Sequence, residues 1–280
     1  MDYLPRAFYD DVFGQLEKKD IGPAQELAGA PGIAAVDHFQ KRRELTLRII
    51  RGTNDCAFQL TVSTRRRQVV PMNDLRSMYD RITHIFLEAD QKTMSKAMSF
   101  RDALSKIAVA LRFASNCTIQ TKFWDKYNLF FTKQFFKLLG RSQTFKKVDT
   151  PNYGEECEEF VRKQMRSVHL QILRLSYGSW PTDFHNLVTS WTENPKFRSL
   201  HCYSMMLDYE TVVSLLKRWA NGELKWFSVD AKASFEKRRI LRLLNDLECS
   251  TEDSIKFNLL GRSTLRIDFF LGSFSVEILT

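Results

Sequence analysis

Apolar and polar residues alternate in two rhythms along most of this chain. In LQILRLSYGSWPTDFHNLVTSWTEN, residues 170–194, apolar positions first alternate as in a strand. They then recur at the three- and four-residue spacing of a helix with one buried face. Gly178 and Pro181 lie between the two parts and predict a turn. The expected core residues of this unit are Leu170, Leu173, Leu175, Phe184, Leu187, Val188 and Trp191.

The same strand–helix unit recurs. Its first strand positions are 25, 27 and 27 residues apart, at Phe145, Leu170, Phe197 and Leu224. A period in the twenties predicts a solenoid, in which each unit buries its apolar face against its neighbours. Looser members of the series precede these units, at Ile82, Ile85, Leu87 and Ile119.

Different patterns flank the repeats. Residues 44–63 predict two strands joined at residues 52–55, and residues 254–279 predict three short strands. Such strands could cover the ends of a repeat array. The sequence therefore predicts an α/β fold: a small N-terminal helical segment, irregular strand–helix repeats and terminal β strands. A doubly wound α/β sheet is the alternative.

The repeat spacing resembles that of leucine-rich repeats, whose strands carry apolar residues at positions 1, 4 and 6. Those repeats place Asn or Cys at position 9, where the side chain satisfies backbone groups of the loop. The residues at that position here are Tyr153, Gly178, Met205 and Lys232. The array is therefore leucine-rich-repeat-like and departs from the family at this position.

An amphipathic helix is predicted in LPRAFYDDVFGQLEKKDI, residues 4–21. Proline suits the first turn of a helix because its missing N–H is not needed there. The spacing resembles the start of an F-box, which has Leu-Pro, a paired aliphatic position, a Leu and then Asp-Leu. The matching residues are Leu4, Pro5, Val12, Phe13, Leu16, Asp20 and Ile21.

The second half of the F-box pattern is harder to find. The Trp that the family places after this point is absent, and Gly29, Pro31 and Gly32 indicate that no second long helix follows. With its strand–helix units, the whole chain resembles the nematode group of F-box and F-box-associated proteins. Residues 1–40 would then be the F-box-like segment and residues 41–280 the F-box-associated repeat domain.

The resemblance implies the substrate-recognition subunit of a Skp–cullin–F-box ubiquitin ligase, in which other subunits carry the transfer chemistry. An apolar helical surface would dock on the Skp-type adaptor of the cullin–RING ligase. The residues expected to bind the adaptor are Leu4, Pro5, Phe8, Val12, Phe13, Leu16, Asp20 and Ile21.

The repeat strands predict the surface for an unknown target protein. Strand residues that alternate with the buried set face outward, and parallel strands would align them into one basic face with aromatic residues. Arg, Tyr and Trp are the residue types that dominate interface hot spots. The expected face comprises Arg174, Arg198, His201, Tyr203, Lys225, Trp226 and Ser228.

Two other functions stay open. The N-terminal helix could pack on the hairpin at residues 44–63, which would leave an interaction scaffold with a vestigial F-box. Alternatively, the net charge of +9 could serve nucleic-acid binding, with bases stacking on Tyr203 and Trp226.

Chemistry of its own is not expected. The five histidines form no metal motif and the five cysteines no CxxC pair, and the glycine-rich phosphate motifs are absent. We therefore expect no enzyme activity, no metal and no cofactor. No apolar run approaches about 18 residues, and the N-terminus lacks the pattern of a secretory signal. These observations predict no membrane partner, reduced thiols, and a cytoplasmic or nuclear location.

Overall fold

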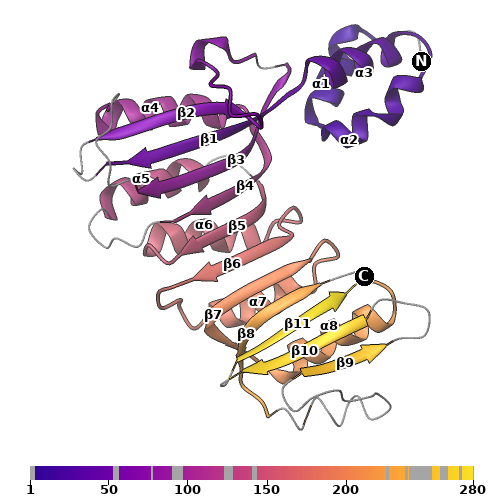
Figure 1. The fold of residues 1–280 in the computed structure, drawn as a ribbon, viewed down its shortest axis with the longest axis vertical. Coiled ribbons are helices and arrows are strands. Elements are labelled where there is room, and N and C mark those ends of the chain that lie inside the picture. The colour runs from indigo at the N-terminus through magenta and orange to yellow at the C-terminus, as the bar shows by residue number, and fades with distance from the viewer. Residues whose placement is uncertain are drawn as a thin grey trace. The chain divides into compact units, whose positions relative to one another are not determined.

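A computed structural model shows the fold (Figure 1). It describes residues 4–52, 57–76, 78–89, 97–122, 129–140, 144–224, 227–236, 239, 254–258, 264–270 and 273–279. The chain divides into two compact units, Met1–Thr118 and Ile119–Thr280.

The first unit begins with a small helical segment that has its own core. It contains α1 (Arg6–Gln15), α2 (Lys18–Ile21), the 3-10 helix η1 (Pro23–Glu26) and α3 (Ala30–Lys41). Pro5 precedes α1, as its fixed φ favours. The residues of this core are Tyr9, Phe13, Ile21, Ala34 and Ala35.

The expectation that no second long helix follows the first is wrong, because α3 is such a helix. Pro31 lies in its first turn, where a missing N–H costs nothing. Gly32 permits a close approach of the preceding loop, since a Cβ there would lie 1.8 Å from the carbonyl oxygen of Leu27.

A sheet follows the helical segment in the first unit. Strands β1 (Arg43–Arg51) and β2 (Phe58–Thr64) form the predicted antiparallel hairpin, whose turn lies outside the described residues. β3 (Asp80–Ala89) pairs in parallel with β1 after the short η2 (Met72–Asp74). α4 (Phe100–Leu111) then leads into β4 (Ala114–Thr121), which continues into the second unit.

The second unit repeats helix and strand in turn. Its elements are α5 (Leu129–Gly140), β5 (Phe145–Pro151), α6 (Glu155–Met165), β6 (Ile172–Ser176), α7 (Phe184–Thr192), β7 (Ser199–Leu207), α8 (Tyr209–Ala220) and β8 (Ser228–Ala233). Strands β5 to β8 are parallel and adjacent in chain order. Antiparallel strands extend the sheet beyond β8 in the order β11 (Ser273–Leu279), β10 (Thr264–Phe270) and β9 (Ser254–Asn258).

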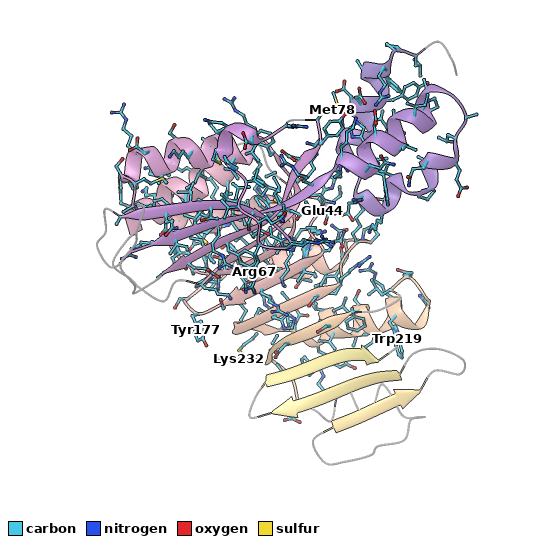
Figure 2. All side chains as sticks on the ribbon, turned by 45° about the horizontal axis from the view of Figure 1, so that its top comes forward. Glu44, Arg67, Met78, Tyr177, Trp219 and Lys232 are labelled. Carbon is cyan, nitrogen blue, oxygen red and sulfur yellow. The ribbon has the colours of Figure 1, made fainter. Side chains whose placement is uncertain are left out.

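The helices α5 to α8 cover one face of strands β5 to β8, and each contacts the next (Figure 1). Apolar residues of the strands face these helices and are buried, as the alternation predicted: Val148, Leu173, Leu175, Leu200, Cys202, Val229 and Ala231. On α8, Trp219 is buried, whereas Lys232 at the end of β8 is exposed (Figure 2). The α/β class is therefore confirmed.

The predicted spacing is wrong by two residues at the last repeat. Leu200 pairs with Val229 in the β7–β8 ladder, whereas the aligned pattern placed Phe227 beside it. A shift of two keeps the same side chains on the buried face, because strand side chains alternate with period two. The repeat pattern also predicts a helix after this strand, with Phe235, Ile240, Leu241, Leu244 and Leu247 on its apolar face; of these, only Phe235 lies within the described residues.

Candidate functional site

Helix α1 carries an exposed row of large apolar side chains. Leu4, Phe8, Val12 and Leu16 retain 44%, 46%, 39% and 36% of their accessible surface. Phe8 and Val12 lie four residues apart on one face of α1, and Leu4 and Leu16 flank its two ends, where the backbone at Pro5 and Leu16 is extended. We call these four residues the α1 stripe. On its other side, α1 packs on α3.

The other predicted adaptor residues divide between core and surface. Phe13 is 5% exposed and Ile21 is fully buried, and both belong to the core of the helical segment. Pro5 and Asp20 are exposed. Phe13 and Ile21 therefore support the helices from inside, and the α1 stripe is the part that a partner can reach.

Two arginines from the sheet side fix the C-terminal end of α1. Arg42 donates from Nη2 to the carbonyl oxygens of Phe13 and Gly14, at 2.6 and 3.1 Å, and from Nη1 to that of Leu16. Arg81 donates from Nε to the carbonyl oxygen of Gly14 at 2.7 Å. Helices end with carbonyl oxygens that lack partners, and positive charge is favoured there. Burial lowers the pKa of Arg42 to about 10, so it is still charged at neutral pH.

Polar contacts also join α1 to α3. Arg6 bonds Asp10 at 3.0 Å and Asp37 at 2.8 Å. The buried His38 ring places Nε2 3.0 Å from Oδ1 of Asp10. Since a carboxylate only accepts, Nε2 carries the proton, while Nδ1 is buried with no hydrogen-bond partner in the described part of the chain. Burial accordingly lowers the pKa of His38, although Asp10 opposes the shift.

A charged row crosses the sheet of the second unit on the face opposite the helices. The ladder aligns Asp149 with Arg174, Arg174 with His201, and His201 with Asp230. Nη1 of Arg174 lies 4.0 Å from Oδ2 of Asp149, and Nδ1 of His201 lies 3.7 Å from Oδ2 of Asp230. Lys147 lies two residues before Asp149 and therefore on the same face.

Three groups of this face have shifted pKa values. Burial raises the pKa of Asp149, and the charge of Arg174 opposes that shift. Burial lowers the pKa of Lys147, and the like charge of Arg174 lowers it further. Burial also lowers the pKa of His201. Shifted groups cluster at functional sites more often than elsewhere, so this row is a candidate site.

The predicted target residues are only partly brought together. Arg174 is exposed on the charged row, Ser228 is half-buried on the same face, and Arg198 is exposed just before β7. His201 is in the row but retains only 18% side-chain exposure, with Nε2 2.9 Å from Oγ of Ser199. The side chain of Tyr203, and Lys225 and Trp226, lie outside the described residues.

The sequence prediction missed Lys147, Asp149 and Asp230. Their outward positions in the strand alternation could have revealed them, because each alternates with buried neighbours. Arg42 and Arg81 gave no sequence signal, since their contacts join residues far apart in the chain.

No group of His, Cys, Asp and Glu within the described residues is arranged to hold a metal ion. Among the same residues, no helix is both long and apolar enough to cross a membrane.

Comparisons with known proteins give little. No protein-family model matches the chain, and no curated protein matches it. One solved structure that matches is the MycE methyltransferase of the mycinamycin biosynthetic pathway, in complex with Mg and SAH. It is 11% identical, the match covers 99% of this chain and 93% of that one, and the TM-score is 0.24.

Proposed function

We propose that this chain is a non-catalytic substrate receptor of the F-box type, which binds a Skp-type adaptor through the α1 stripe and a target protein through the second unit. The observation that carries the proposal is the exposure of the α1 stripe on a helical segment with its own core. A helix that already fills its core on one side has its other apolar side left for a partner. Such a receptor would act in the cytoplasm or the nucleus.

The energetics favour such a partner. Burying a Val, Leu or Phe side chain contributes roughly 1.5–3 kcal/mol before the costs of association. Phe8 and Val12, at helical spacing on α1, with Leu4 and Leu16 at its ends, would serve as the anchors of a helix that lies in an apolar groove. The contacts of Arg42 and Arg81 hold the end of α1 in place, so less conformational freedom would be lost on binding.

The second unit supports the other half of the proposal. Its parallel strands lie in chain order with helices on one face, and this order supports the proposal of a leucine-rich-repeat-like array. The opposite face of β5 to β8 then carries polar and charged side chains available to a target.

The test is capture of purified Skp-type adaptors, taken from nematodes because the sequence resembles a nematode family. The wild-type chain is compared with a Val12→Asp/Leu16→Asp variant. We expect stoichiometric capture by the wild type and loss of at least about tenfold in affinity for the variant, because two charges would enter an apolar groove. Val109→Asp is the matched control, since Val109 on α4 is 40% exposed and lies away from the stripe.

Circular dichroism and thermal unfolding show whether each variant is folded. If the folded wild type captures no adaptor, or if Val109→Asp loses capture as fully as the double variant, the receptor proposal fails.

A further inference from the structure

The sheet face opposite helices α5 to α8 carries more cations than carboxylates around one point. Asp149 is only 8% exposed, and Nε2 of Gln120 donates to its Oδ2 at 3.3 Å. Arg174, Lys147, Lys122 and His201 all act electrostatically on this carboxylate. Three of these four groups are lysine or arginine side chains, so one carboxylate lies among three basic groups. Asp230 lies on the far side of the row, beside His201.

The basic side chains of Arg174 and Lys147 have few charged or hydrogen-bonding partners. Nη1 of Arg174 lies at 4.0 Å from Asp149, at the limit of an ion pair, and its side chain is 45% exposed. Lys147 is half-buried, and its side chain makes no hydrogen bond or ion pair within the described part of the chain. It also lies near the like charge of Arg174. Half-buried cations that repel one another are stabilised by an added anion.

We propose that this face binds an acidic segment of a protein, with a Glu or Asp carboxylate placed between Lys147 and Arg174. The inference rests on the proposed function, because it names the chemistry of the target that the receptor selects. The planar guanidinium of Arg174 would donate to both carboxylate oxygens, as Arg does at such sites. Asp149 then competes with the incoming carboxylate for the same arginine.

Nucleic acid fits this face less well. Asp149 and Asp230 would repel a phosphate backbone that follows the row, and affinity for nucleic acid depends on many phosphate contacts. A short acidic segment needs only the cations next to Asp149.

The test measures fluorescence anisotropy of a labelled oligoglutamate peptide with the full chain at low salt. We expect Lys147→Gln and Arg174→Gln each to weaken binding about five- to tenfold. Asp149→Asn is expected to tighten binding about two- to fivefold, because the competing carboxylate is gone while the amide oxygen can still accept from Gln120. Loss of structure would not produce such a gain.

Arg166→Gln is the matched control. It removes the same charge from an exposed side chain at the end of α6 and should change affinity less than about twofold. The inference is overturned if wild type does not bind, if Arg166→Gln weakens binding as much as Arg174→Gln, or if Asp149→Asn weakens it. It is also overturned if labelled oligothymidylate binds more tightly and is lost in the same variants.

Adaptor capture is measured on the same preparations. Adaptor capture without peptide binding refutes this inference and leaves the receptor proposal standing. Peptide binding that follows the variants, without adaptor capture, supports an acidic-segment binding face and refutes the receptor proposal.

Discussion

Arg42 donates from Nη2 to the carbonyl oxygen of Phe13 at 2.6 Å, across 29 residues of sequence. Arg42 follows directly after α3, whereas Phe13 lies in the last turn of α1. The contact therefore joins the last turn of α1 to the residue at which the chain leaves α3 and enters the sheet. It satisfies carbonyl oxygens that a helix leaves without partners at its C-terminal end.

Replacing Arg42 by Met should destabilise this segment. The substitution keeps much of the aliphatic side chain but removes the donor to the carbonyl oxygens of Phe13 and Leu16, while that of Gly14 keeps only Arg81. We expect the free energy of unfolding to fall by about 2–4 kcal/mol. Urea unfolding followed by circular dichroism, with amide exchange of α1, measures the loss.

Arg66→Met is the control, because Arg66 is exposed and the same substitution there should stay within about 0.5 kcal/mol. Equal losses for the two variants would show that the contacts of Arg42 contribute nothing specific.

His38 should make the helical segment sensitive to acid. Burial lowers its folded pKa below the ordinary 6.5, so the unfolded chain binds a proton that the folded chain does not. Stability is then complete above about pH 6.5 and is lost as the pH falls toward the folded pKa, at a rate of at most about 1.4 kcal/mol per pH unit. The groups that face the ring are Asp10, Arg6, Arg42, Phe13 and Tyr79.

The measurement is urea unfolding as a function of pH for the wild type and for His38→Gln. The variant should show a flatter pH dependence below about pH 6.5, since Gln does not titrate. His169→Gln, at an exposed position, should keep the wild-type dependence. A His38→Gln curve parallel to that of the wild type would contradict the assignment.

Sequence alone predicted the strands and helices of the second unit well, because their period is set by burial. Leu173 and Leu200 face the helices as the alternation requires. The register of β8 was missed by two residues, because spacing along the chain does not show how many residues a loop absorbs.

The features that the sequence could not predict depend on contacts between residues that are far apart in the chain. Val12 and Phe13 are neighbours in one apolar pattern, yet one is exposed and the other buried, because only α3 decides which side of α1 is covered. The row from Asp149 to Asp230 likewise depends on the register of four strands. Alternation gives the face of each residue but not its neighbour on the next strand.

Phe13 and Val12 should therefore differ sharply on truncation. Phe13→Ala leaves a cavity in the small helical core and should cost about 3 kcal/mol or more. Val12→Ala removes an exposed side chain and should change stability by less than about 0.5 kcal/mol. Urea unfolding together with amide exchange of residues 9–39 checks both values. Similar losses for the two variants would mean that Val12 is also covered by its own chain.

Gly178, in the loop that follows β6, lies against Asn152, in the loop that follows β5. Gly178 has φ of +104°, and a Cβ there would lie 2.9 Å from Cβ of Asn152. The backbone N–H of Asn152 donates to the carbonyl oxygen of Tyr177 at 3.0 Å. Its Nδ2 donates to the carbonyl oxygen of Ser179 at 2.6 Å. The two loops therefore meet too closely for a side chain at residue 178.

Gly178→Ala should lower the free energy of unfolding by about 1–3 kcal/mol, because it adds backbone strain at positive φ and a contact that forces the loops apart. Gly140→Ala is the matched control, since a Cβ there meets no atom of the described residues within 4 Å, and it should change stability by less than about 1 kcal/mol. Urea unfolding followed by tryptophan fluorescence reports on this unit, where Trp180 and Trp191 lie. If Gly178→Ala is as stable as Gly140→Ala, the two loops move apart without loss of stability, and their close contact does not hold neighbouring repeats together.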